Sequence, residues 1–239
     1  MKHQKLLSYV RQAVDDYKMI EENDKIAVGL SGGKDSISLL LVLSDLRRFY
    51  PKKFDLCAIT VSLGFDGSDF TPMEELCKKI NVDYHVIDTQ IGEIIFDARK
   101  EPNPCSLCAK MRKGALNNKA DELGCNKIAL GHNRDDIIET FMMSLIFEAR
   151  INTFQPISFL EKKKLFSIRP LMYVPESDIK GYVRKNNLPI IKNPCPANGN
   201  TKRQEMKELI RDLCRKYDNV DTKIFNAISR SKIDGWSKE

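Results

Sequence analysis

The segment Ile26–Ser36 constrains the fold of this chain more than any other part of the sequence. It begins with a short apolar run, Ile26–Leu30, of the kind that forms a buried parallel strand, and it continues through two glycines into a helical pattern. Glycines allow backbone N–H groups to turn inward around an anion, and the following helix N-terminus adds the positive end of its dipole. Ser31 and Ser36 add hydroxyl donors, and Lys34 adds a positive charge. The segment therefore predicts an α/β fold with a phosphate-binding loop after this strand.

Two other phosphate loops are excluded by their spacing. A Walker A loop needs glycine five positions before Gly33 and Ser or Thr after its lysine, where this chain has Val28 and Asp35. The G-x-G-x-x-G spacing of dinucleotide-binding folds is also absent from this segment. The remaining alternative is a glycine-rich turn capped by Asp35 or Ser36, which would be the better interpretation of an isolated Ser-Gly-Gly. The strand before the loop and the helix after it favour phosphate binding.

Apolar strand patterns and helical patterns alternate along the chain, which indicates βαβ units and a Rossmann-like parallel sheet with helices on both faces. We expect strands at 25–30, 54–61, 83–87, 127–130 and 189–191, a hairpin within 154–170, a loop at 100–104, and helices at 4–21, 37–46, 72–80, 106–123, 135–147, 175–187, 201–216 and 221–229. We interpret residues 1–239 as a single domain, in which an N-terminal helix (1–22) precedes an α/β core (23–200) and closing helices (201–239).

The composition agrees with a folded enzyme and says little about its partner. Hydrophobic residues make up 42% of the 239 residues, which is enough to bury a core. The first residues contain no apolar signal segment, and no stretch has the length of a membrane span, so we expect a soluble, cytoplasmic protein without a membrane partner. The formal net charge of +6 is compatible with RNA binding and equally with an ordinary lysine-rich surface.

The seven cysteines fall into two groups. Four lie singly in apolar periodic segments, and we interpret them as small core residues: Cys57, Cys77, Cys125 and Cys214. The others, Cys105, Cys108 and Cys195, lie among prolines and polar residues. A C-x-x-C pair alone is equally typical of zinc, redox and iron–sulfur sites. A structural zinc site would normally need a fourth ligand, and a thioredoxin-like pair would follow a strand instead of preceding a helix.

A second polar loop, Gly131–Asp136, follows the predicted strand at 127–130 and begins a helix. Because the carboxyl ends of parallel strands line the ligand crevice of a doubly wound sheet, we expect this loop to face the phosphate loop. Its carboxylates are suited to hold Mg²⁺ together with phosphate oxygens. The alternative is that Asp135 simply caps the helix and His132 is a hydrogen-bonded loop residue. The position of the loop at a strand end favours the functional interpretation.

Several motifs occur together in a fixed order. They are Ser-Gly-Gly-Lys-Asp-Ser at 31–36, Pro-Cys-Ser-Leu-Cys at 104–108, Ala-Leu-Gly-His-Asn-Arg-Asp-Asp at 129–136, Ile-Arg-Pro-Leu at 168–171, and the downstream Cys195. In these motifs the chain resembles the PP-loop ATP pyrophosphatases, and among them the tRNA 2-thiocytidine biosynthesis family, over about residues 20–216. The resemblance implies an adenine nucleotide alpha hydrolase-like fold and an enzyme that converts ATP to AMP and pyrophosphate while it adenylates a substrate oxygen.

The resemblance also implies cofactors and site residues. ATP would be bound, with Mg²⁺, by Ala27, Ser31, Gly32, Gly33, Lys34, Asp35, Ser36, Gly131 and Asp136. The residues expected to act in catalysis are Lys34, Arg112 and Asp136. Cys105, Cys108 and Cys195 would hold a [4Fe–4S] cluster that leaves one iron without a protein ligand and able to bind hydrosulfide. Longer members of the family carry a second C-x-x-C where this chain has only Cys195, which leaves the route of sulfur delivery open.

The implied reaction is a tRNA sulfur transfer, in which a cytidine of the anticodon loop is adenylated and receives sulfur at C2. The sulfur would come from a cysteine desulfurase or free sulfide, and a homodimer is one of the assemblies left open. Basic residues that could contact tRNA phosphates are Lys110, Arg112, Lys113, Lys119, Arg169, Lys202, Arg203, Lys207 and Arg211, although solvated helix faces carry the same residues. The alternatives are 2-thiouridine synthesis, small-molecule thiolation, lysidine synthetase-like ligation, and a zinc or redox RNA-binding module without catalysis.

Overall fold

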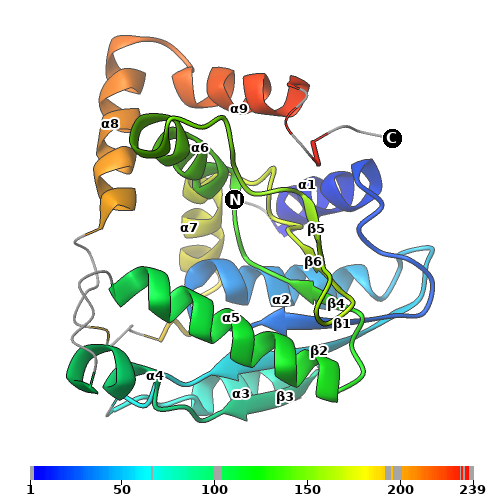
Figure 1. The fold of residues 1–239 in the computed structure, drawn as a ribbon. Coiled ribbons are helices and arrows are strands. Elements are labelled where there is room, and N and C mark those ends of the chain that lie inside the picture. The colour runs from blue at the N-terminus through cyan, green and yellow to red at the C-terminus, as the bar shows by residue number, and fades with distance from the viewer. Residues whose placement is uncertain are drawn as a thin grey trace.

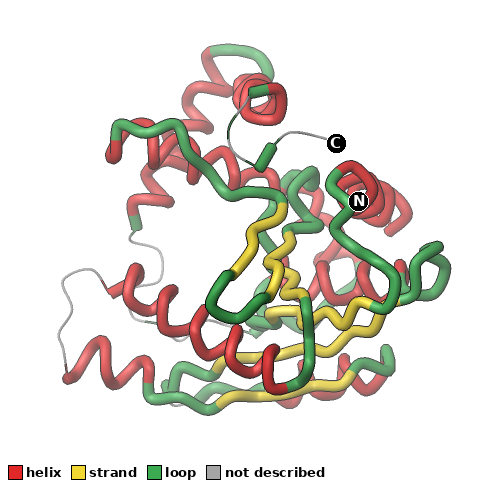
Figure 2. Tube along the Cα trace, turned by 45° about the vertical axis from the view of Figure 1, so that its right-hand side comes forward, coloured by secondary structure: helices red, strands yellow, loops and turns green. Residues whose placement is uncertain are grey.

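The computed structural model describes residues 3–65, 67–98, 104–191, 195, 201–231, 233 and 235–236. In these residues six strands form one twisted sheet in the order β3-β2-β1-β4-β6-β5 (Figures 1 and 2). Their bounds are β1 Asp24–Gly29, β2 Phe54–Val61, β3 Asp83–Ile87, β4 Lys127–Ala129, β5 Ile157–Leu160 and β6 Leu165–Ile168. All neighbouring strands are parallel except β5 and β6, which form an antiparallel hairpin.

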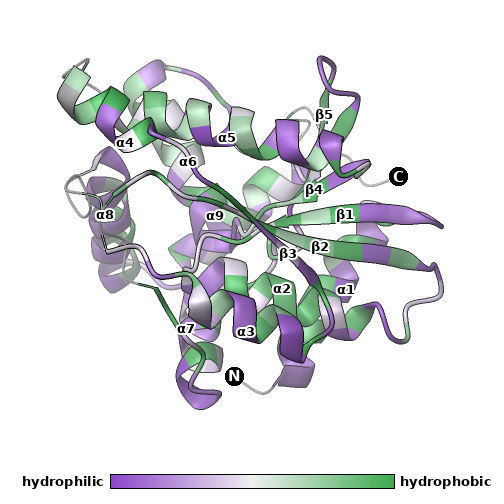
Figure 3. Cartoon of the chain, turned by 90° about the horizontal axis from the view of Figure 1, so that it is seen from below, coloured by the Kyte–Doolittle hydropathy of each residue, from purple (hydrophilic) through white to green (hydrophobic). Residues whose placement is uncertain are grey.

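Helices cover both faces of this sheet. They are α1 His3–Asp16, α2 Lys34–Leu46, α3 Thr71–Lys79, α4 Ile91–Glu93, α5 Pro104–Glu122, α6 Arg134–Glu148, α7 Glu176–Lys185, α8 Lys202–Lys216 and α9 Val220–Arg230, with a π-helical turn, η1, at Ile94–Ala98. Figure 3 shows α4 and α5 on one side of the strands and α1, α2 and α3 on the other. Helix α5 packs on β2 and β4, whereas α8 and α9 pack on α6. The predicted α/β class, with helices on both faces, is confirmed.

The predicted elements agree with the structure in kind, except that one predicted strand is absent and two short elements, α4 and η1, were not predicted. The expected strand at 189–191 is wrong: Ile191 forms no ladder, and its N–H donates instead to the carbonyl oxygen of Gly32 at 3.0 Å. The π-helical turn η1 has no counterpart in the sequence prediction, because its residues show no distinct periodicity. Of the predicted loop at 100–104, only Pro104 is described, and it begins α5.

The sheet separates two apolar clusters. The larger one fills the face of α1, α2, α6 and α7, and the smaller one lies between the sheet and α5. Trp236, 1% exposed, closes the larger cluster and donates from Nε1 to the carbonyl oxygen of Phe154. Cys57, Cys77 and Cys125 are buried as predicted, whereas Cys214 is only half-buried on α8.

A buried ion pair connects the first residue of β1 to the first residue of β4. The Nζ atom of Lys127 lies 2.7 Å from Oδ2 of Asp24, and the two side chains are 9% and 3% exposed. The carboxylate also accepts from the backbone N–H of Glu21 and from the side chain of Asn126. Because the side chains of Asp24 and Lys127 are withdrawn from water, the carboxylate depends on its partners for compensation.

We predict that Lys127→Met lowers the free energy of unfolding by about 3 kcal/mol, because it leaves the buried carboxylate of Asp24 without its cation. Urea denaturation followed by circular dichroism measures the change. The matched control is Lys78→Met, which removes the exposed i,i+4 partner of Glu74 and should change stability by less than about 0.5 kcal/mol. Equal small effects of both substitutions would show that the buried Asp24–Lys127 pair contributes no more to stability than the exposed Lys78–Glu74 pair.

Candidate functional site

The phosphate loop lies between the carboxyl end of β1 and the N-terminus of α2. The backbone N–H of Ser31 donates to Oγ of Ser36 at 3.1 Å, and that hydroxyl donates to the carbonyl oxygen of Gly33 at 3.0 Å. These bonds fold the loop over the first turn of α2. No side chain among the described residues caps this helix, so its first N–H groups stay available for an anion.

Two glycines are required by the packing around this loop. Gly32 has φ of +75°, and a Cβ at this position would lie 2.8 Å from the Cβ of Ile191. Gly131, in the loop after β4, approaches α2 so closely that a Cβ would lie 3.1 Å from the backbone nitrogen of Ser36. The two loops are therefore in contact through their backbones, as expected for neighbouring parallel strands.

The second loop is held by a capping box at the start of α6. The side chain of Asn133 accepts from the N–H groups of Asp135 and Asp136, and the N–H of Asn133 donates to the carboxylate of Asp136. The amide of Asn133 also donates to Oδ1 of Asp35 at 2.9 Å. Asn133 is thus the cap, and Asp135 has another task, because its carboxylate accepts from the N–H of Glu176 at the start of α7.

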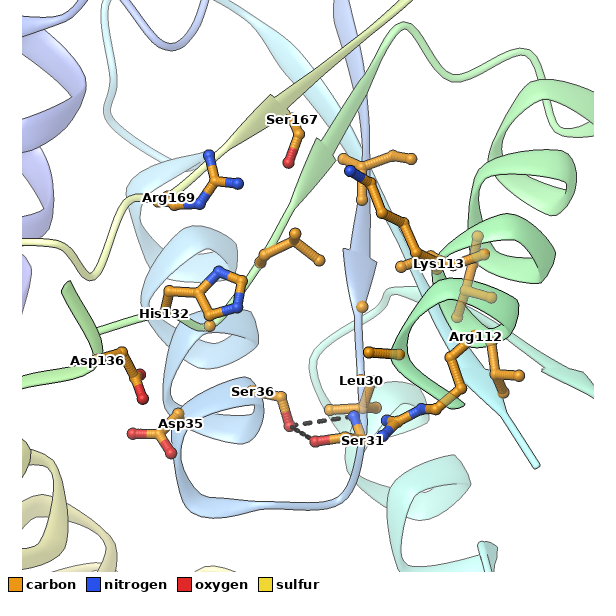
Figure 4. Close-up of a pocket in the computed structure, with 18 of the residues that line it drawn as sticks. Leu30, Ser31, Asp35, Ser36, Arg112, Lys113, His132, Asp136, Ser167 and Arg169 are labelled. Atoms are coloured by element: carbon orange, nitrogen blue, oxygen red, sulfur yellow. Dashed lines mark hydrogen bonds between the residues drawn. The ribbon is translucent and has the colours of Figure 1, made fainter. Parts of the chain in front are cut away.

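A cavity of about 570 Å³, a size typical of small-molecule sites, lies between these loops, the sheet and α5 (Figure 4). Of the predicted nucleotide and catalytic residues, it is lined by Ser31, Asp35, Ser36, Arg112, Gly131 and Asp136. The residues Ala27, Gly32, Gly33 and Lys34 do not line it. Ala27 is fully buried within β1, and the two glycines shape the loop through their backbone.

Lys34 faces carboxylates. Its ammonium lies 2.6 Å from Asp35 and 3.1 Å from Glu176. Burial lowers the pKa of Lys34, but the two carboxylates outweigh it and raise the pKa above its ordinary value. Glu176 is itself surrounded, since Lys207 and Lys180 lie 2.6 and 2.9 Å from its Oε2. In this arrangement the charge of Lys34 orients Asp35, and its contact with phosphate stays a prediction.

Asp35 and Asp136 form the acidic part of the cavity. Burial raises the pKa of Asp136, the hydrogen bond from Asn133 and the charge of Arg203 lower it, and Asp35 raises it again. Two carboxylates on one cavity wall beside a phosphate loop are the donors that Mg²⁺ prefers. These residues fit the predicted metal.

Arg203 belongs to the site, although its sequence position in a basic helix suggested an RNA-facing surface. Its guanidinium lies 3.3 Å from Glu139 and 3.7 Å from Asp136, and it donates to Thr140. Burial and the charge of Asp136 together raise the pKa of Glu139 to about 7, against the opposing effects of Arg203 and Lys207. Arg203 therefore points from α8 into the protein and balances two carboxylates of α6.

The three predicted cluster cysteines line one further cavity. Cys105 and Cys108 come from the first turn of α5 and Cys195 from the segment before α8. Burial raises the pKa of Cys108, Arg112 lowers it, and Cys195 and Cys105 raise it, so the thiols interact electrostatically. This cavity shares Ala109, Arg112, Asp136 and Arg203 with the phosphate-loop cavity.

The three thiols provide the ligands of the predicted cluster. Cluster thiolates bind different irons, so that three cysteines around one cavity can hold a [4Fe–4S] cluster with one iron left without a protein ligand. Three cysteines around one cavity, beside a positive Arg112, therefore fit the predicted [4Fe–4S] cluster.

The far wall of the phosphate-loop cavity contains His132 and Arg169, which belong to motifs of the sequence, together with Phe154 and Ser167. His132 stacks on Phe154 with ring centroids 4.2 Å apart, and burial, with the nearby positive charges, lowers its pKa to about 3. Arg169 donates to the carbonyl oxygen of Gln155 and to Ser158, and burial lowers its pKa to about 10. Ser167 and Phe154 were not predicted, because nothing in their local sequence distinguishes them from other residues of the predicted hairpin segment.

Within the described part of the chain, no helix has the length and apolarity to cross a membrane.

Comparison with known proteins agrees with this geometry. Residues 3–214 match the PP-loop domain family. A tRNA-cytidine(32) 2-sulfurtransferase of Pelobacter propionicus is 37% identical over 92% of this chain and 83% of its own length. One from Geobacter metallireducens is 36% identical over 95% and 90%. The fold is similar to that of the U34-tRNA thiolase NcsA from Methanococcus maripaludis, solved with its [4Fe–4S] cluster (TM-score 0.76, 24% identity, 96% of this chain and 83% of NcsA). The chain therefore belongs to the PP-loop family, in the same branch as the tRNA-cytidine(32) 2-sulfurtransferases.

Proposed function

We propose that this chain is an ATP-dependent tRNA sulfurtransferase that converts cytidine 32 of the anticodon loop to 2-thiocytidine. The observation that carries the proposal is the wall of Ala109, Arg112, Asp136 and Arg203, which the phosphate-loop cavity shares with the cysteine cavity. The phosphate-loop cavity would activate the oxygen, and the cysteine cavity would supply the sulfur that replaces it. Both cavities must therefore open onto the same carbon atom of the substrate. The names of the relatives supply the nucleoside and its position.

In the proposed first step, the phosphates of ATP bind along Ser31–Ser36 and the free N–H groups of α2. The carboxylates of Asp35 and Asp136 hold Mg²⁺. The C2 oxygen of cytidine forms a bond to the α-phosphorus, and the bond to the bridging oxygen breaks, so that pyrophosphate leaves. Arg112 and Arg203 line the reaction space and stabilise the negative charge that develops on the phosphoryl oxygens.

In the proposed second step, sulfur replaces the activated oxygen. Cys105, Cys108 and Cys195 would hold the [4Fe–4S] cluster, which supplies an iron without a protein ligand as the site of hydrosulfide. A bond from sulfur to C2 forms, and the C2–oxygen bond breaks with release of AMP. The shared wall keeps the activated base beside the thiols. Arg112 lines both the cavity of the phosphate loop and the cavity of the cysteines.

The partners of the proposed reaction are tRNA and a sulfur donor, either a cysteine desulfurase or free sulfide. As tRNA is the substrate, we propose that the protein works in the cytoplasm. Thiolation rates with free sulfide and with a desulfurase plus cysteine separate the two donors. Light scattering at working concentration separates a monomer from the homodimer that the sequence leaves open.

The direct test of the function is mass spectrometry of nucleosides from tRNA incubated with the protein, ATP, Mg²⁺ and sulfide under anaerobic conditions. We expect 2-thiocytidine to appear, together with one AMP and one pyrophosphate for each thiolated base. Appearance of 2-thiouridine or lysidine in place of 2-thiocytidine would assign the chain to another reaction of the family.

We predict that Cys105→Ser, Cys108→Ser and Cys195→Ser each abolish thiolation and cluster binding, because a serine oxygen is a poor ligand for iron–sulfur clusters. Iron, sulfide and visible absorbance measured after anaerobic purification test this. The matched control is Cys214→Ser, since Cys214 is half-buried on α8 and lines neither of the two cavities. A protein that retains one tightly bound zinc and no iron would contradict the proposed role of the cysteines.

We predict that Asp136→Asn lowers the rate of AMP formation roughly a hundredfold, because it removes a carboxylate that holds the metal on the phosphates. Asparagine has a similar shape and can still accept from the N–H of Asn133. Single-turnover measurements with labelled ATP give the rate, and the iron content of the variant should equal that of the wild type. Unchanged AMP formation would place the metal on other residues.

A further inference from the structure

The phosphate-loop cavity has two halves of different chemistry. The half over β1 and β2, under α5, has an apolar floor of Gly29, Leu30, Ile59, Val61 and Leu116, and α5 also brings Arg112, Lys113 and Asn117 to the cavity. The half over β4 and β6 is lined by His132, Phe154, Ser167 and Arg169. Figure 4 shows Ser167, Arg169 and His132 around one part of the pocket, with Ser31, Ser36, Asp35 and Asp136 at the other end. Both halves meet at the phosphate loop, because Gly131 touches Ser36.

Three polar atoms in the second half have no hydrogen-bond partner among the described residues. They are Oγ of Ser167, Nδ1 of His132 and Nε of Arg169. Ser167 is 2% and Arg169 is 6% exposed, so solvation from bulk water does not compensate them. An unpaired buried polar atom costs about 1–3 kcal/mol, and in folded proteins such atoms are typically completed by an ordered water, an ion or a ligand. Three of them on one cavity wall indicate a polar subsite.

The shape and charge of this wall suit a planar heterocycle. The stacked rings of His132 and Phe154 form a flat surface, and the guanidinium carbon of Arg169 lies 5.2 Å from the centroid of Phe154. His132 is neutral, since its pKa is about 3, so its two ring nitrogens are one donor and one acceptor. The Nη1 atom of Arg169 is already used by Gln155 and Ser158. A nucleobase edge therefore finds donors and an acceptor on this wall.

We propose that His132, Ser167 and Arg169 form the subsite that recognises the pyrimidine base to be thiolated, while the apolar half takes the adenine of ATP. The proposal rests on the proposed function. The polar half adjoins the cysteine side, because the guanidinium of Arg203, which lines both cavities, lies 5.9 Å from the ring of Phe154. A base bound in this half is therefore within reach of both the α-phosphate and the sulfur.

This subsite provides a means to select cytosine. Cytosine presents acceptors at O2 and N3 and a donor at its N4 amine, whereas uracil has a donor at N3 and an acceptor at O4. A site with hydrogen-bond groups fixed by burial rejects a ligand with a mismatched edge, because the buried groups then stay unpaired. The groups fixed by burial here are Ser167 in β6, Arg169 directly after β6, and His132 in the loop between β4 and α6.

The test compares Ser167→Ala and His132→Phe with the wild type. Alanine removes only the hydroxyl, and phenylalanine keeps a flat ring against Phe154 while it deletes Nδ1. Binding of two anticodon stem-loop RNAs, with cytidine or uridine at position 32, is measured by fluorescence anisotropy, and ATP binding by calorimetry. We expect the preference for cytidine to fall about tenfold in each variant, as for a lost hydrogen bond, with the dissociation constant for ATP changed less than about twofold. The matched control is Ser229→Ala on the exposed part of α9, which should change neither.

The outcomes separate this proposal from the proposed function. If the wild type thiolates cytidine but the variants keep the full preference for cytidine, the subsite proposal is wrong and the function stands. If the variants instead weaken ATP binding about tenfold and leave RNA selection intact, the polar half holds the nucleotide and the proposal is overturned. If the wild type forms no 2-thiocytidine, the proposed function fails and this proposal fails with it.

Discussion

The contact between the two loops at the ends of β1 and β4 determines the geometry of the whole site. Gly131 lies against the backbone of Ser36, and the amide of Asn133 holds the carboxylate of Asp35. This arrangement requires that two neighbouring parallel strands end at the same level and that no Cβ separates their loops. It places the N-termini of α2 and α6 side by side, so that two helix dipoles point at one small volume. Any anion bound there is held by backbone groups that cannot turn away.

Charge compensation extends from this contact to the rest of the site. The other oxygen of Asp35 binds Lys34, which also contacts Glu176 at the start of α7. Glu176 binds Lys207 of α8, and burial of its carboxylate is outweighed by the surrounding lysines, which lower its pKa to about 2. Helix α8 is thereby fixed against the phosphate loop, and its Arg203 reaches the cysteine cavity. Lys34, Lys207 and Arg203 thus pair with carboxylates of the site, so the net charge of the sequence is a poor measure of an RNA-binding surface.

The parts of the site that depend on local chemistry were predictable from the sequence. The phosphate loop is a strand, two glycines and a helix, and each of these leaves a signal within a few residues. The same holds for the capping loop before α6 and for the pair Cys105 and Cys108. The position of Lys34 was not predictable, because its direction is set by Glu176, which is remote in the sequence. Arg203, Phe154 and Ser167 were missed or misplaced for the same reason: their roles come from how α8 and the β5–β6 hairpin pack, and a single sequence does not encode that packing locally.

The shared wall between the two cavities also bears on the order of the proposed chemistry. An adenylated base is reactive, and water would hydrolyse it if it had to move to a second site. Because Arg112, Asp136 and Arg203 face both cavities, the same groups that stabilise the phosphoryl charge remain in contact with the activated base when sulfur arrives. The base can then stay in place between the two steps, and only AMP has to leave. This argument favours a fixed base between two fixed reagents, which requires a subsite rigid enough to hold the base through both steps, and the buried wall of β6 and Phe154 supplies such rigidity.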